Sequence, residues 1–349
     1  MGLCFLDRPN TDEQIEIAKL ADEKGFDTVW VCETRLVRDA ISVLGSFASV
    51  TKKIKLATGV INIWTRVPSL TALTFATLDE ISHGRAVLGV GAYWDPLAWK
   101  QGIKRRKPLA AMREWVEVVR RLFRLERVTF EGEIMRVRDL QLDLGYGRRR
   151  ETIRVPIYIG ATGLNMLELS GEIADGVLLN AFTSVNYLKE SLHRISTGAK
   201  RARRKMKEID LPQLIAVAMS EDTAKAKDEA RYLATLYLGQ QPHIGIASGI
   251  SPNLVEEIKT ALGGWPPRKD GAEEAMKLVD DKVVDLLTVA GTPEECREGV
   301  GEYVKGGASY PVILPITLAL GTWCRSSAPE GALSSARRSR APSFPRRCH

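Results

Sequence analysis

Residues 77–91 read TLDEISHGRAVLGVG and decide the fold, because a helix ends within them and a buried strand follows directly. The helical pattern runs from Ser69 to Ser82 and stops at Gly84, a residue suited to the left-handed conformation that ends helices. The next run, Ala86–Val90, is short and apolar throughout, as strands covered on both faces of a parallel sheet are. A helix that leads directly into such a strand is part of a repeating βαβ pattern.

The same alternation extends over the rest of the chain. Eight apolar runs are separated by helical stretches, which favours an α/β fold of the TIM (β/α)8 barrel type, although an open doubly wound sheet would also alternate in this way. The predicted strands cover residues 2–6, 28–31, 54–60, 86–90, 155–160, 176–179, 214–219 and 310–316. The predicted helices cover residues 11–24, 39–50, 69–82, 109–125, 187–207, 222–238 and 292–305, with a further helix from Asn165.

Two insertions and one helix start are also predicted. Residues 128–142 alternate polar and apolar side chains around Glu131-Gly132, which predicts an inserted hairpin. Residues 239–285 are punctuated by glycine and proline and contain helical pieces, which is typical of an insertion. Thr11 and Gln14 have the spacing of a capping box at the start of the first helix.

The charge of the chain is concentrated at its end. Of the net charge of +7, residues 323–349 carry +5, from six arginines and one glutamate, so the body is nearly neutral and no nucleic-acid-binding face is indicated. We expect one barrel domain over residues 1–316 and an irregular basic tail rich in Ser, Arg and Pro over residues 317–349. Either disorder or a shifted reading frame would produce a tail without a helical apolar period.

Composition is that of an ordinary globular protein, with 44% hydrophobic and 27% charged residues. No apolar run reaches the roughly 18 residues of a membrane span, and the first residues show no secretory pattern, so we expect a cytoplasmic protein that binds no membrane. The five cysteines show no metal-ligand spacing, and no metal site is predicted. Cys4 and Cys32 lie in apolar runs and are expected to be buried thiols.

Three blocks of sequence resemble the luciferase-like superfamily. They are TGVINIWTRVP (58–68), TLDEISHGRAVLGVG (77–91) and GATGLNMLELSGEIADGVLLN (160–180). Within the superfamily the chain is most similar to the branch that uses coenzyme F420, a 5-deazaflavin, typified by methylenetetrahydromethanopterin reductase. The resemblance covers most of residues 1–316. It is specific for the superfamily and much less so for cofactor and substrate.

The resemblance implies cofactor contacts at the carboxyl ends of the strands, where such barrels bind ligands. In this family a non-proline cis peptide bond lies in a bulge that packs under the three-ring system of the cofactor. Gly59-Val60, followed by Ile61, matches its position. The turn Gly160-Ala161-Thr162-Gly163 matches the family's phosphate site, and its small residues before a helix would let backbone amides approach an anion. The glycine spacing alone favours a plain tight turn, and the strand before it and the helix after it make a phosphate site at least as well supported. Ala92 and Asn180, each after a strand, are the remaining expected cofactor contacts.

Glu33, at the end of the second strand, is the candidate catalytic residue. Many deazaflavin-dependent relatives have Asp-His where this chain has Glu33-Thr34, so the resemblance supplies no histidine proton donor and argues against alcohol or sugar oxidation. Glu33 is expected to contact the ring or to act as an acid, unless it is a solvated carboxylate at a loop edge. Asp39 is expected to cap the next helix and form an ion pair, and Arg66 either steers an anion or forms a salt bridge.

Other candidates carry less specific predictions. Trp94 and Trp99 either line the site of a flat substrate or only pack against other side chains of the protein. Tyr93 stands where the family usually has a glycine. Asp175 is expected to support the turn into the sixth strand. The histidines at 83, 193 and 243 have no partners at catalytic spacing and are assigned no role.

Three functions are compatible with these residues. The favoured one is a coenzyme F420-dependent oxidoreductase that transfers a hydride between deazaflavin and a small organic substrate, and its sharpest form is a 5,10-methylenetetrahydromethanopterin reductase. The second is an FMN-dependent luciferase-like monooxygenase, and the third is a non-catalytic flavin-binding relative. Since relatives commonly pair through barrel helices, a homodimer is expected.

Overall fold

The computed structural model describes residues 1–145 and 152–316, so the predicted tail lies outside the described residues. Most of its strands are short, apolar and parallel, and several are buried along their whole length. The barrel strands are β1 (Gly2–Phe5), β2 (Thr28–Val31), β3 (Lys55–Thr58), β5 (Ala86–Gly91), β8 (Ile157–Gly160), β9 (Gly176–Leu178), β10 (Pro212–Met219) and β12 (Tyr310–Pro315). Two shorter strands, β4 (Ile61–Asn62) and β11 (Val289–Gly291), pair with β5 and β10.

These eight strands form a closed ring. Val312 of β12 is the register partner of both Gly2 in β1 and Leu214 in β10, so the last strand lies between the first and the seventh. On the other side of β10, parallel bridges link Gly176 to Asp210 and Leu179 to Gln213. An open sheet would leave two unpaired edges, so the predicted barrel is confirmed and the doubly wound alternative is wrong.

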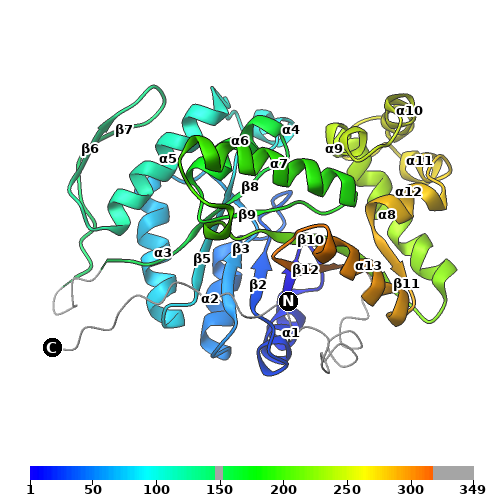
Figure 1. The fold of residues 1–349 in the computed structure, drawn as a ribbon, viewed down its shortest axis with the longest axis horizontal. Coiled ribbons are helices and arrows are strands. Elements are labelled where there is room, and N and C mark those ends of the chain that lie inside the picture. The colour runs from blue at the N-terminus through cyan, green and yellow to red at the C-terminus, as the bar shows by residue number, and fades with distance from the viewer. Residues whose placement is uncertain (146–151, 317–349) are drawn as a thin grey trace.

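Helices surround the ring on its outer side (Figure 1). The helices that alternate with the barrel strands are α1 (Thr11–Glu23), α2 (Ala40–Val50), α3 (Pro68–Ser82), α5 (Pro108–Phe123), α6 (Leu164–Ile173), α7 (Val185–Arg201), α8 (Thr223–Gln240) and α13 (Pro293–Lys305). Their apolar sides pack on the strands, whereas helix α5 places the charged side chains of Arg113 and Glu117 away from the core. Among the described helices, none is both long and apolar enough to cross a bilayer.

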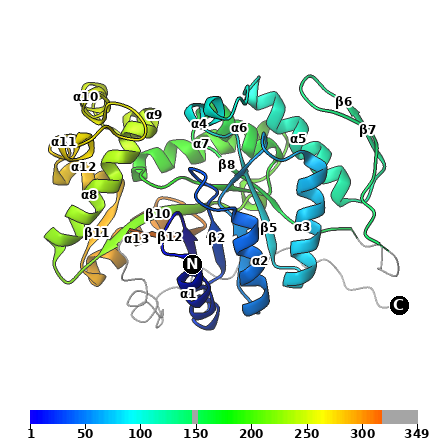
Figure 2. The same cartoon turned by 180° about the vertical axis from the view of Figure 1, so that it is seen from behind.

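The two predicted insertions lie at opposite ends of the molecule, as Figures 1 and 2 show from two sides. The hairpin consists of β6 (Val128–Glu131) and β7 (Arg136–Leu140), which pair antiparallel as expected. The second insertion consists of short helices between α8 and β11. They are α9 (Pro242–Ala247), α10 (Pro252–Leu262), α11 (Gly271–Met276) and α12 (Asp281–Leu287).

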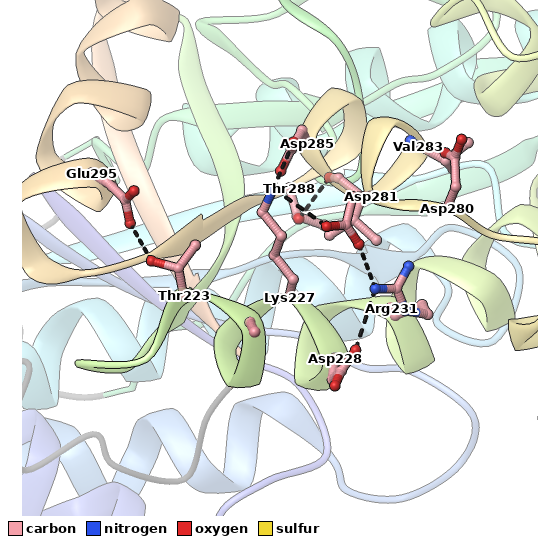
Figure 3. Close-up of polar contacts among 12 residues, drawn as sticks. Thr223, Lys227, Asp228, Arg231, Asp280, Asp281, Val283, Asp285, Thr288 and Glu295 are labelled. Carbon is pink, nitrogen blue, oxygen red and sulfur yellow. Dashed lines mark hydrogen bonds and ion pairs between the residues drawn. The ribbon is translucent and has the colours of Figure 1, made fainter.

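Charged side chains hold the second insertion on helix α8 (Figure 3). Arg231 pairs with Asp281 at 2.6 Å and with Asp228 at 3.2 Å, and Lys227 pairs with Asp285 at 2.8 Å. Because Arg231 and Lys227 belong to α8 and their partners Asp281 and Asp285 belong to α12, these pairs join the first helix of this region to the last. The pairs thereby fix α12 beside the amino-terminal half of α8.

Three local predictions need correction. Asn10 rather than Thr11 caps helix α1, because its side chain accepts a hydrogen bond from the Glu13 amide at 3.0 Å. Helix α7 ends at Arg201 instead of 207 and is followed by a short 3-10 turn at Met206–Glu208. The third strand is shorter than residues 54–60, and β11 and the small helix α4 (Asp95–Lys100) were not predicted.

Candidate active site

A cavity of about 1060 Å³ opens at the carboxyl ends of the barrel strands. It is lined by residues that follow β2, β3, β5, β8 and β9, which is where a barrel enzyme of this type places its ligands. The structure brings all the sequence-predicted site residues to this one cavity, and their roles in binding stay predictions. They are Glu33, Gly59, Val60, Ile61, Ala92, Gly160, Ala161, Thr162, Gly163 and Asn180.

Val60 forms part of the cavity wall, where two neighbouring strands leave room for its side chain. The Gly59-Val60 peptide bond is cis, as the resemblance implies. A Cβ atom at Gly91 would lie 2.7 Å from Val60 Cγ2, and one at Gly160 would lie 2.9 Å from Val60 Cγ1. Only glycine therefore fits at these two positions of β5 and β8 while Val60 stays in place. The result is a small apolar shelf at the barrel mouth.

A buried thiol supports the shelf from β2. Cys32 donates a hydrogen bond from Sγ to the Gly59 carbonyl oxygen at 2.7 Å, and its sulfur lies 3.5 Å from that of Cys4. Both cysteines are buried, as predicted. The contact ties the end of β2, next to Glu33, to the shelf after β3.

The turn at residues 160–163 leads into helix α6. Gly163 is the N-cap residue of α6, and the first amides of a helix have no acceptor within it. Tyr187 of α7 donates a hydrogen bond to the Thr162 carbonyl oxygen at 2.5 Å, which fixes the turn from outside. The Thr162 hydroxyl lies 3.1 Å from Nε2 of His243, a residue of α9. Free amides at the positive end of a ten-residue helix suit a phosphate group.

Glu33 follows β2, and the turn at residues 160–163 follows β8, with β3 and β5 between these strands. The Glu33 side chain is only 16% exposed. Arg66 donates a hydrogen bond to Glu33 at 3.1 Å and also pairs with Asp39. Burial raises the pKa of Glu33, and the positive charge of Arg66 opposes that rise. Asp39 caps helix α2 by accepting from the Ser42 amide, so its predicted capping and ion-pair roles are confirmed. Of the two roles predicted for Arg66, steering an anion or forming a salt bridge, the structure shows the salt bridge.

Asn180 is held by a tyrosine that the sequence did not identify. Its side-chain amide donates to the hydroxyl of Tyr237, near the carboxyl end of α8. The ring of Tyr237 stacks on Phe182 with 4.6 Å between centroids, and burial raises the pKa of its hydroxyl. With the amide nitrogen engaged, Asn180 keeps its side-chain oxygen available as an acceptor.

Aromatic and charged side chains surround the cavity mouth. Trp94 lines it and packs edge-on against Trp265 of the insertion at 6.2 Å, while Arg35 lies 5.7 Å above the Trp265 ring. Trp99 is 79% exposed on α4 and does not line the cavity, so it has neither predicted role. Tyr93, which replaces a usual glycine of the family, has a φ of 68°, in the region that glycine adopts most easily.

Sequence reasoning missed the residues that the end of α8 and the second insertion contribute. Gln240, Gln241 and His243 line the cavity, as does Tyr237. No motif marks them: Tyr237 lies within the predicted helix 222–238, the other three fall in the punctuated stretch 239–285, and nothing local indicates that either segment reaches the site. Asp175 has the predicted structural role, since its carboxylate accepts from the Ile157 amide at 2.8 Å.

Comparisons with known proteins agree with this geometry. A family model described as luciferase-like monooxygenase matches residues 4–310. The 5,10-methylenetetrahydromethanopterin reductase of Methanolobus tindarius is 33% identical over 296 residues, which cover 84% of this chain and 87% of the reductase. The F420-dependent glucose-6-phosphate dehydrogenase of Nakamurella multipartita is 30% identical over 285 residues, which cover 76% and 82% of the two chains.

A solved structure is also similar over nearly the whole length. The coenzyme F420-dependent tetrahydromethanopterin reductase from Methanopyrus kandleri superposes with a TM-score of 0.80 at 28% identity, covering 90% of this chain and 92% of that one. The match therefore extends over nearly the whole of both chains. On the family model and these relatives together, the chain is an oxidoreductase that belongs to the luciferase-like monooxygenase family.

Proposed function

We propose that this protein is a coenzyme F420-dependent reductase of a one-carbon-carrying pterin such as 5,10-methylenetetrahydromethanopterin. The observation that carries the proposal is the cavity with an apolar shelf at Val60, a helix amino terminus at residues 160–163 and a buried carboxyl at Glu33. The reductase from Methanolobus tindarius, which bears this activity in its name, supports the choice of substrate.

The residues present fit a phosphorylated tricyclic cofactor. Glycines at positions 91 and 160 open the space that Val60 occupies, so a flat ring system can lie on the shelf without meeting other side chains there. The amides before α6 suit the phosphate group, and the Asn180 oxygen suits a ring N–H. The cavity of about 1060 Å³ is large enough to hold a substrate beside the ring. Reduced deazaflavin, when bound, supplies a hydride.

Glu33 has the properties of the acid that this reduction requires. When a hydride adds to the methylene carbon, one carbon–nitrogen bond breaks and its electron pair goes to the nitrogen, which must gain a proton. Burial keeps the Glu33 carboxyl protonated to a higher pH than an exposed glutamate, so it can donate that proton. Arg66 and Asp39 hold the carboxyl in place through their ion pairs.

The test is to titrate the purified full-length protein with coenzyme F420 and with FMN and to follow their fluorescence. The proposal expects micromolar or tighter binding of coenzyme F420, weaker binding of FMN, and oxidation of reduced coenzyme F420 when methylenetetrahydromethanopterin is added. Tight FMN binding with oxygen uptake would instead support a flavin monooxygenase. Binding of either cofactor without turnover of any substrate would indicate a non-catalytic relative.

We also propose that the protein forms a homodimer through helices α2 and α3, which lie side by side in both views (Figures 1 and 2). Residues 40–50 and 68–78 contain no charged side chain, which is unusual for the outer face of a barrel helix. Leu70 and Leu73 are 46% and 47% exposed on α3. A second copy of the chain is the occupant that best suits such a long uncharged face, since the same face is available on both copies.

Replacing Leu73 with glutamate is expected to separate this dimer. A charge placed in an apolar interface loses its water without gaining a partner, so the dissociation constant of the dimer should rise at least about a hundredfold. Sedimentation velocity at micromolar concentration measures the change. Leu278→Glu is the control, because Leu278 is also partly exposed, at 37%, but lies on the insertion. A monomeric wild-type protein, or a Leu73→Glu variant that sediments as a dimer, would exclude this interface.

A further inference from the structure

His243 joins two parts of the chain that are far apart in sequence. Its Nε2 atom lies 3.1 Å from the Thr162 hydroxyl, across a separation of 81 residues. His243 belongs to the short helix α9, and only Gln241 separates α9 from the end of helix α8. Both partners line the large cavity, so the pair faces the ligand site.

The turn that His243 contacts is the anionic end of the proposed ligand site. Thr162 is held by Tyr187 through its carbonyl oxygen, and the amides that follow it open helix α6. Glu33 follows β2, and Thr162 follows β8, with β3 and β5 between those strands. His243 is thus placed at the end of the site where a phosphate would be bound, and away from the carboxyl that would exchange a proton with the substrate.

We propose that His243 is a phosphate ligand of this site, and that the insertion thereby selects phosphorylated over unphosphorylated cofactors. The inference rests on the proposed function, because it assigns one more contact to the same cofactor. His243 and the Thr162 hydroxyl would both donate to phosphate oxygens, while the amides of α6 supply the rest of the site. Burial lowers the pKa of the free histidine, and an adjacent phosphate would favour its protonated form, which is a stronger donor.

The test compares coenzyme F420 with its unphosphorylated deazaflavin core, which keeps the ring and the ribityl chain. The dissociation constant of each is measured by fluorescence titration with the wild-type protein and with His243→Ala. The variant should bind coenzyme F420 about tenfold more weakly and the core with less than a twofold change, as expected for the loss of one charge-assisted hydrogen bond. His243→Gln, which keeps a donor, should lose less, and His193→Ala on helix α7 is the matched control.

The outcomes separate this inference from the proposed function. If neither deazaflavin binds the wild-type protein, the proposed function itself fails. If both bind but His243→Ala weakens them equally, His243 only supports the turn structurally and the inference is wrong. If the variant binds both ligands as the wild type does, the histidine makes no contact with the phosphate. A selective loss for the phosphorylated ligand alone supports the inference.

Discussion

Glu33→Gln is expected to lower kcat by about 10²- to 10³-fold, while the dissociation constant of coenzyme F420 changes less than about threefold. The amide keeps the size of the side chain and can still accept from Arg66, so the site should stay assembled. What it loses is the proton that the carboxyl donates to the substrate nitrogen. A steady-state assay of reduced coenzyme F420 oxidation, combined with a fluorescence titration, separates the two effects.

The pH dependence of the wild-type enzyme gives an independent check on Glu33. Burial raises the pKa of this carboxyl, so its protonated form persists at pH values where exposed glutamates have ionised. In the reducing direction, activity should therefore be highest below the raised pKa and should fall as the pH rises through it. Glu33→Gln should abolish this limb, and the exposed Glu23→Gln should leave it unchanged. A kcat that survives Glu33→Gln would show that another group donates the proton.

Gly89→Ala is expected to destabilise the barrel by about 3 kcal/mol or more, because the added methyl group cannot be accommodated. A Cβ atom at Gly89 would lie 1.8 Å from the Thr58 carbonyl oxygen. Thr58 also uses its hydroxyl to accept from the Gly89 amide at 2.9 Å and to donate to the Gly89 carbonyl at 2.8 Å. These contacts hold β3 against β5 just below the Val60 shelf, and a methyl group would force the strands apart.

Urea denaturation measures this change as a shift of the unfolding midpoint. The slope of the unfolding free energy against urea concentration is compared between the variants. Gly301→Ala is the matched control, because Gly301 lies inside helix α13 and a Cβ there would meet nothing within 4 Å. That substitution should stabilise the protein by roughly 0.5–1 kcal/mol, since alanine favours a helix over glycine. Equal stability of Gly89→Ala and wild type would mean that β3 and β5 approach each other less closely than described.

Much of the barrel was predictable because each strand is a local pattern. The run Ala86–Val90 is apolar and follows a helical pattern that stops at Gly84, and these features lie within one short stretch of sequence. The turn at residues 160–163 was predictable as part of the site for the same reason, since strand, glycines and helix follow one another directly. The family resemblance then indicated which strand ends to examine.

Other parts of the site depend on contacts that no local pattern contains. Tyr237 lies near the end of a predicted helix and His243 in a stretch predicted only to contain helical pieces, and their partners lie 57 and 81 residues away. The cap of α1 was misassigned for a related reason. Asn10 and Thr11 are adjacent residues that both favour the N-cap position, and in the structure Asn10 has the extended backbone of an N-cap residue, with φ −63° and ψ 168°.

The pairing of β12 with β1 has a consequence for biosynthesis. Gly2 and Leu3 pair with Val312 and Ile313, so β1 gains this neighbour only after the intervening strands of the barrel have been synthesised. Until residues 310–315 have left the exit tunnel, β1 and β10 present bare hydrogen-bonding edges to other nascent chains. Chaperone demand should therefore be greatest late in translation, and fragments that stop before Tyr310 should collect in inclusion bodies.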